Sequence, residues 1–356
     1  MDATTFKVME ALAGAWAAPM SIRELAGRVK RLHGTAHYAN IYRKVQALAE
    51  DGTVRLQTVG RSSGVSLGMG SRTVRLLAEM ETERKSRLME GRPRLGILID
   101  EIESGFRSRI NAVSSVSIVD AERNLSLNRA ELLFLLAEAD GGAAVAVADE
   151  TEAGIHALMA KLQKMRNLRL DYLIVKRSQF IRLLRESYAN PLKSMLPRQV
   201  AFFRPQDFWT AVKEAGEQGA GAWNAETVEP ARMPEMDMAY NLDRFGYTEL
   251  GRKLQRGADI RLEYVIVSIL IKGDTRRLEA IPTLLAKNPV DYGMLFYLCK
   301  KYKRLEGLMG TLKAFTKARK DAGAERLVTA MQSAGVRPSR FDAAAAVGKM
   351  RLYGAD

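Results

Sequence analysis

The chain has one cysteine, three histidines and no long apolar run in its 356 residues. Cys299 has no partner, which excludes a disulfide framework and a zinc ribbon and is typical of a reduced core residue. His33, His37 and His156 lie far from any cysteine or carboxylate cluster with metal-ligand spacing, so no metal site is expected. The longest apolar run, 264–271, is too short to span a bilayer, and no signal pattern opens the chain. These absences predict a soluble, cytoplasmic protein with no membrane partner.

Positive charge is what the chain has in excess. It carries 55 Lys and Arg against 41 Asp and Glu, a formal net charge of +14, which favours a polyanionic partner. Residues 1–75 hold 11 Lys and Arg against 5 Asp and Glu, so the bias is concentrated near the N-terminus. With 47% hydrophobic residues, the chain is long enough for two or three domains with sizeable cores.

Two helix-patterned segments, 21–32 and 39–49, flank a short break at 34–37. In the first, Ser21 and Glu24 form a capping box before an apolar pattern at helical spacing, namely Ile22, Leu25, Ala26, Val29 and Leu32. In the second, the predicted buried stripe is Ile41, Val45 and Leu48. The residues left on or beside the opposite face are Asn40, Tyr42, Arg43, Lys44 and Gln46, which are types that touch bases and phosphates.

A hairpin is predicted directly after these helices. Strands at 53–59 and 65–67 flank the turn 60–64, with Arg55 on the first strand and Arg61 in the turn. With residues 6–13 as an opening helix, this order resembles the winged helix-turn-helix domains of bacterial and archaeal transcription regulators. The resemblance covers about the first 75 residues and implies binding of double-stranded DNA. A winged helix used only to bind protein is the alternative.

Residues 73–89 read as a charged helix with a narrow apolar stripe of Val74, Leu77, Met80 and Leu88. This stripe suits a partner helix in a homodimer. The alternative is a strut that lies on the chain's own α/β domain.

Strands alternate with helices from residue 95 to residue 214, which predicts a mixed α/β domain. The expected strands are 115–119, 131–136, a weaker one at 143–148, 168–175 and 200–203. The expected helices are 95–110, 152–166 and 178–187.

The segments LRLDYLIVKRSQFIRLL and SMLPRQVAFFRPQDFW resemble the minimal nucleotidyltransferase fold over about 100 residues. Active members hold nucleotide phosphates with a Gly-Ser pair, and two Mg²⁺ ions with Asp-x-Asp and a third Asp. On this sequence the Gly-Ser pair falls at Asp120 and Ala121, Asp-x-Asp falls at Arg129 to Glu131, and the third Asp falls at Asp171.

The resemblance therefore implies an inactive site. Asp120 would repel a triphosphate, and Arg129 would stand where a metal ligand is needed. Glu131 and Asp171 are then ordinary strand carboxylates, paired with Arg129 or Arg169. The alternative is a divergent, toxin-like nucleotidyltransferase that modifies RNA or nucleotides through Glu131 and Asp171 with Mg²⁺. Only that alternative requires a cofactor.

A linker rich in Gly and Ala is predicted at 215–238, and helices follow it to the end of the chain. These helices are expected at 261–272, 275–287 with a division at Pro282, 291–302, 305–319, 323–334 and 340–352. They form a C-terminal helical bundle suited to binding a protein partner.

The sequence thus predicts an α+β multidomain protein. The domains are an N-terminal winged helix (1–75), a connecting helix (76–94), a nucleotidyltransferase-like α/β domain (95–214), a linker (215–238) and a helical domain (239–356). The predicted function is a sequence-specific transcription regulator that binds double-stranded DNA. Its nucleotidyltransferase-like domain is predicted to be inactive, so the protein is not expected to be an enzyme. A winged helix beside such a domain is similar to abortive-infection toxin and antitoxin pairs, in which the winged-helix partner is the repressing antitoxin. A protein-binding scaffold is the third alternative.

Overall fold

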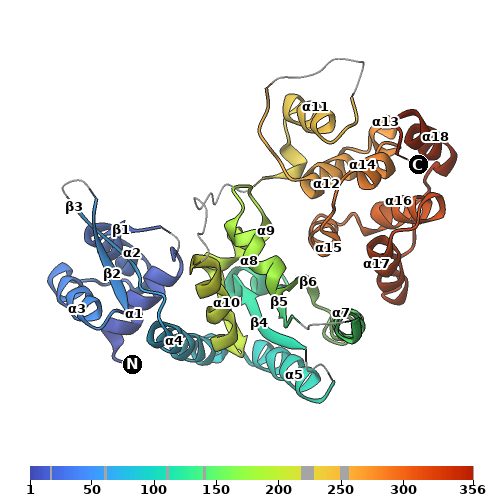
Figure 1. Ribbon diagram of the computed structural model, residues 1–356. Helices are drawn as coiled ribbons and strands as arrows, with labels where there is room; N and C mark the ends of the chain where they lie inside the picture. Colours follow the sequence, from blue (N-terminus) through green and yellow to red (C-terminus); the bar gives the residue numbers. More distant parts are fainter. Residues whose placement is uncertain are drawn as a thin grey trace. The chain divides into compact units, whose positions relative to one another are not determined.

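The computed structural model of the chain (Figure 1) describes residues 1–16, 18–59, 62–109, 112–138, 142–217, 228–248 and 256–355. The chain folds into two units, each formed by segments that are not contiguous in sequence. Unit 1 contains Met1–Thr151, Val175–Ser187 and Leu192–Ala225. Unit 2 contains Glu152–Ile174, Tyr188–Pro191 and Glu226–Asp356. Among the described residues, no helix has the length and apolar character needed to cross a bilayer.

Unit 1 begins with three helices and a small sheet. The elements are α1 (Ala3–Ala13), β1 (Met20–Ser21), α2 (Ile22–His33), α3 (Tyr38–Glu50), β2 (Val54–Val59) and β3 (Ser62–Leu67). The three strands pair antiparallel in the order β1-β3-β2, with Val65 between Met20 and Leu56. Gly34 ends α2 with a φ of 76°, a conformation that glycine adopts without a steric penalty. The predicted helices and hairpin are confirmed, and the two-residue strand β1 was not predicted.

The local signals in this region are confirmed at the level of side chains. The Ser21 hydroxyl accepts from the Glu24 amide at 3.2 Å, and the Glu24 carboxylate accepts from the Ser21 amide at 2.7 Å. The stripe of Ile41, Val45 and Leu48 is buried, as predicted. Leu32 departs from the predicted apolar pattern of α2. The buried side of this helix ends at Val29, and Leu32 is 51% exposed.

Helix α4 (Ser71–Met89) packs against α1, α10 (Pro205–Glu217) and β7 (Gln199–Phe203) within unit 1. Its apolar stripe of Val74, Leu77, Met80 and Leu88 is buried by these elements. The expectation that this stripe faces the helix of a second copy is therefore wrong, and the alternative, a strut on the chain's own α/β domain, is confirmed by the contacts with α10 and β7. Sequence spacing alone shows that a helix face needs a cover, but it does not show which surface supplies the cover.

The second sheet contains β4 (Val113–Val119), β5 (Arg129–Leu136), β6 (Arg169–Lys176) and β7, in the order β6-β5-β4-β7. β4 pairs antiparallel with both β5 and β7, so that Ile118 lies opposite Leu132 on one side and Val200 on the other. β4 is buried along its whole length, and β5 is buried from Ala130 onward, as expected for strands covered on both faces.

Helices precede, connect or follow the strands of this sheet along the chain. They are α5 (Pro93–Arg109), α6 (Ala121–Ser126), α7 (Gly142–Arg166), α8 (Arg177–Arg185), α9 (Pro191–Met195) and α10. The weak strand predicted at 143–148 is wrong, because these residues belong to the first turns of α7. Their alanines have the highest helix propensity, and an amphipathic helical segment follows them directly. The short helices α6 and α9 and the longer helix α10 were not predicted.

The C-terminal part of unit 2 is helical, as predicted. Its elements are η2 (Pro230–Arg232), α11 (Glu235–Arg244), α12 (Leu262–Lys272), α13 (Thr275–Leu278), α14 (Ile281–Lys287), α15 (Tyr292–Lys301), α16 (Leu305–Ala318), α17 (Ala322–Ser333) and α18 (Ala343–Leu352). The predicted division at Pro282 is confirmed, because Pro282 occupies the first turn of α14, where a missing amide costs nothing. Cys299 is buried in α15 with a free thiol. Within the linker predicted at 215–238, residues 218–227 lie outside the described residues. The predicted linker is wrong at both ends, because α10 extends to Glu217 and α11 begins at Glu235.

Candidate functional site

The outer face of α3 carries all five of the helix residues predicted to contact DNA. Asn40, Tyr42 and Arg43 are exposed, while Lys44 and Gln46 are half-buried. The face exists because Ile41, Val45 and Leu48 are used for the core on the other side. Helix α3 packs against β2 as well as against α1 and α2, so its buried side is fixed by three neighbouring elements.

Three of these polar residues already have partners within the chain. The Arg43 guanidinium donates from Nη2 to Asn40 Oδ1 at 2.7 Å, across one turn of the helix. The Lys44 ammonium donates to Asp2 Oδ2 at 3.0 Å. Exposed ion pairs of this kind contribute little, about 0 to 1 kcal/mol, so a phosphate can compete with Asp2 for Lys44.

Asp2 has a second task at the start of α1. Its Oδ1 accepts from the amides of Thr4 and Thr5, and its Oδ2 accepts from the Thr5 hydroxyl at 2.6 Å. These hydrogen bonds, chiefly the one from the Thr5 side chain, hold the pKa of Asp2 well below its usual range. Asp2 therefore keeps its negative charge beside Lys44, a pairing that the local sequence pattern does not reveal.

A pair of tyrosines lies on the same helix. Tyr38 and Tyr42 are four residues apart, and their rings stack with centroids 6.3 Å apart and an interplanar angle of 29°. Both remain exposed, Tyr38 by 53% and Tyr42 by 44%. Sequence reasoning missed Tyr38, although its i,i+4 spacing to Tyr42 was a usable signal.

The hairpin supplies one further cation among the described residues. Arg55 lies exposed on β2, opposite Ser66 of β3. Arg61, the other predicted wing residue, lies outside the described residues. Helix α2 adds exposed cations that sequence reasoning did not single out, namely Arg23, Lys30 and Arg31. Arg72, at the start of α4, forms a 2.9 Å ion pair with Asp51 after α3.

The two strand carboxylates of the enzyme alternative are each bound by an arginine two residues earlier. Glu131 Oε2 lies 3.2 Å from Arg129 Nη2, and Asp171 Oδ1 lies 3.1 Å from Arg169 Nε. The predicted pairings with Arg129 and Arg169 are both confirmed. In the part of the chain that the structure describes, no group of three or more His, Cys, Asp or Glu residues is placed to hold a metal ion.

The turn between β4 and α6 has an unusual backbone. Asp120 adopts the left-handed conformation, with φ 47° and ψ 46°, which glycine occupies far more readily than other residues. Its carboxylate lies 3.0 Å from Arg198 Nη1, and its amide donates to the Arg198 carbonyl at 2.9 Å. These two interactions hold the turn in place.

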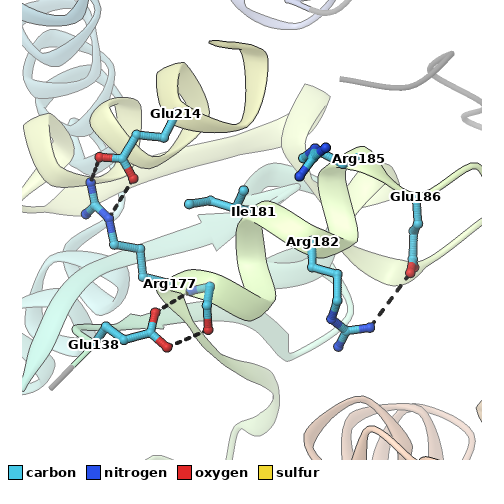
Figure 2. Close-up of a pocket in the computed structure, with 8 residues that line it drawn as sticks. Glu138, Arg177, Ile181, Arg182, Arg185, Glu186 and Glu214 are labelled. Carbon is cyan, nitrogen blue, oxygen red and sulfur yellow. Dashed lines mark hydrogen bonds and ion pairs between the residues drawn. The ribbon is translucent and has the colours of Figure 1, made fainter. Parts of the chain in front are cut away.

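A cleft of about 570 Å³ lies within unit 1, along one face of α8 (Figure 2). Arg177 forms a two-pronged ion pair with Glu214 of α10 at 2.9 and 2.6 Å. Glu138 accepts from the amide and hydroxyl of Ser178 at 2.7 and 2.5 Å. The charged lining comprises Arg177, Arg182, Arg185, Glu138, Glu186 and Glu214, three residues of each sign. With no net charge, the cleft is not suited to a polyanion.

Comparison with protein-family models, with curated proteins and with solved structures found no match to this chain.

Proposed function

We propose that this chain is a sequence-specific transcription regulator that binds double-stranded DNA through a winged helix-turn-helix domain formed by α1 to β3. The observation that carries the proposal is the exposed face of α3, where Asn40, Tyr42 and Arg43 stand over a buried apolar stripe. Arginine and asparagine side chains match the hydrogen-bonding edges of bases in the major groove. The order of helix, strand, two helices and hairpin also supports a winged helix.

The remaining cations have a different role in this proposal. Arg55 on β2 and Lys44 on α3 contact phosphates, which position the domain without reading sequence. Arg61 at the hairpin turn is proposed for the same task. A chain with a net charge of +14 favours such interactions over the whole duplex.

The central sheet is proposed to be a nucleotidyltransferase-like domain without catalytic activity and without a cofactor. The main support is the pairing of Arg129 with Glu131, because a guanidinium occupies the carboxylate that a metal ion would need. The resemblance places the Gly-Ser pair at Asp120 and Ala121, where the structure instead has a carboxylate paired with Arg198. Glu131 and Asp171 are each paired with an arginine, so neither carboxylate is proposed to bind Mg²⁺.

The competing enzyme reading is a toxin-like nucleotidyltransferase that uses Glu131 and Asp171 with Mg²⁺. The left-handed backbone at Asp120 is the observation in its favour, because glycine adopts this conformation most readily and the resemblance places the Gly-Ser pair at this position. We favour the regulator, since the enzyme would have to displace Arg129 and Arg169 from both carboxylates.

The regulator is proposed to work in the cytoplasm in an antitoxin-like role, with its C-terminal helices available for a homodimer interface or a protein partner. Helix α4 is not part of this interface, because its apolar stripe is covered within unit 1. Two copies would double the short site that one winged helix reads.

Selection of bound duplexes from a random pool tests the proposed function directly. The regulator predicts an enriched sequence, and a palindrome if two copies bind together. Its affinity for that duplex should fall steeply with salt, and each phosphate that the protein binds should add about 0.9 to the slope of log K against log salt. Recovery of no enriched sequence, or an affinity that does not respond to salt, would leave the protein-binding scaffold or the enzyme as the better account.

A further inference from the structure

Tyr38 and Tyr42 form an exposed aromatic plate on α3 that the proposed hydrogen bonds to DNA do not use. Both tyrosines are among the exposed large side chains of the chain, Tyr38 by 53% and Tyr42 by 44%. Their rings, 29° apart in plane, present apolar surface along the first two turns of the helix. In a helix-turn-helix protein, the N-terminal residues of this helix contact base edges.

We propose that the Tyr38 and Tyr42 plate reads the 5-methyl group of thymine in the major groove. This inference rests on the proposed function, since it assigns a specificity to the same helix. The thymine methyl is the one apolar group on the base edges of that groove, and it is recognised by apolar side-chain surface. The plate is the largest apolar surface that α3 exposes, because the other exposed apolar residues of this helix are Ala39 and Ala47.

The neighbouring side chains favour a nucleic acid over a protein as the occupant. Arg43 follows Tyr42 directly in the sequence. Its guanidinium donates to Asn40 Oδ1 at 2.7 Å, which fixes the orientation of the guanidinium before it contacts a base. Two of the elements that pack against α3, namely α2 and β2, also carry exposed cations. A partner that covers both the tyrosines and these cations must be apolar at one point and anionic around it, as a thymine methyl flanked by phosphates is.

The tyrosine hydroxyls offer a different interaction, because they can donate to a phosphate oxygen. Substitution of a tyrosine by phenylalanine distinguishes packing on a methyl group from a hydrogen bond to phosphate. A ring that packs on a methyl group works equally well without the hydroxyl, whereas a hydrogen bond to phosphate requires the hydroxyl.

The experiment uses the full chain and the duplex that the wild type enriches from a random pool. Each thymidine is replaced in turn by deoxyuridine, which removes the methyl and keeps the base pair. At one or two positions the affinity should fall about fourfold, the factor expected for losing burial of one methyl-sized group. In Tyr42→Ala or Tyr38→Ala the same replacement should have no effect, while Tyr42→Phe should respond like the wild type.

A matched control is Leu127→Ala, because Leu127 is another apolar side chain of unit 1 that is 64% exposed. It should leave both the affinity and the response to deoxyuridine unchanged. Wild-type binding that is indifferent to every methyl group overturns the inference, as does a methyl response that persists in both alanine variants. Loss of binding in Tyr42→Phe equal to that in Tyr42→Ala would show a phosphate as the group that is bound instead. Unchanged DNA affinity in both alanine variants would assign the plate to a protein partner.

These outcomes are distinct from failure of the proposed function. If no duplex is enriched, the chain is not a sequence-specific regulator, and the methyl test has no substrate. If a duplex is enriched and its binding depends strongly on salt, but no methyl response is seen, the proposed regulator function is supported. Only the proposed thymine recognition is then wrong.

Discussion

Arg84 of α4 lies against Glu10 of α1, with Arg84 Nε 2.9 Å from Glu10 Oε1. The same guanidinium donates from Nη1 to Glu81 at 3.1 Å and to the Gln199 carbonyl of β7 at 2.9 Å. Glu81 is fully buried, and its other oxygen accepts from the Ala201 amide at 3.0 Å. A single ionic network, with Glu81 at its buried centre and Arg84 and Glu10 partly buried, thus joins the first helix, α4 and the edge strand of the central sheet.

Arg84→Met should be strongly destabilising. The substitution keeps most of the side-chain volume but leaves the Glu81 carboxylate buried without its cation, which typically costs about 3 to 5 kcal/mol. Urea unfolding followed by circular dichroism measures the change. Arg75→Met is the control, because Arg75 lies exposed on the same helix and should cost less than about 0.5 kcal/mol. Equal losses in the two variants would show that the network contributes nothing beyond helix surface.

Glu81→Gln should remove a pH dependence of stability. Burial raises the pKa of the Glu81 carboxyl above its ordinary 4.5, against the opposing effect of Arg84. The folded state therefore binds this proton more tightly than the unfolded state, and the free energy of unfolding falls as pH rises from 4.5 through the folded-state pKa. The slope from this group cannot exceed about 1.4 kcal/mol per pH unit.

The measurement is the difference in unfolding free energy between the wild type and Glu81→Gln, taken at steps from pH 4.5 upward. Titrating groups shared by both proteins cancel in this difference. It should decline with rising pH, and a difference that stays constant would mean that Glu81 has the same pKa in the folded and unfolded chains.

Features that depend on neighbouring residues could be predicted from the sequence. The capping box of Ser21 and Glu24 and the buried stripe of α3 follow from spacings of three and four residues, and both are present. The pairings of Glu131 with Arg129 and of Asp171 with Arg169 are also local, because side chains two apart on a strand share a face.

Interactions between distant parts of the chain could not be predicted in this way. Arg84 and Gln199 are 115 residues apart, and Lys44 and Asp2 are 42 apart. The sequence pattern predicts that Lys44 is an accessible cation, but only the folded structure shows that Asp2 lies next to it. For the same reason the sequence leaves open whether the apolar stripe of α4 faces a second copy or the chain's own domain, and the fold shows that α1, α10 and β7 cover it.

Asp2→Asn should strengthen binding of DNA at low salt. Asparagine caps a helix as well as aspartate does, so α1 keeps its N-terminal hydrogen bonds while Lys44 loses its ionic partner. Freeing an exposed cation in this way should raise the affinity about 1.5- to 5-fold, and the gain should disappear as salt increases. Asp2→Ala is the matched comparison, because it frees Lys44 equally but loses the cap, at about 1 kcal/mol of stability. An affinity that does not change in either variant would exclude Lys44 from the DNA interface.

Leu77→Ala should lower stability without changing the oligomeric state. Leu77 is 0% exposed beneath the chain's own elements, and truncating such a residue costs about 2 to 5 kcal/mol. Sedimentation and urea unfolding of the same samples separate the two effects. A variant that keeps its stability but loses mass would place Leu77 at an interface between copies after all.

The central domain should transfer no nucleotide. Full-length protein incubated with each labelled nucleoside triphosphate, with Mg²⁺ or Mn²⁺ and with RNA, is expected to give no labelled product. The physical reason is that both carboxylates which the resemblance assigns to metal binding are paired with arginines, Glu131 with Arg129 and Asp171 with Arg169. Arg129→Ala serves as the companion variant and should also be inactive, since Asp171 stays paired with Arg169. Labelled product that both Glu131→Ala and Asp171→Ala abolish would make the chain a nucleotidyltransferase.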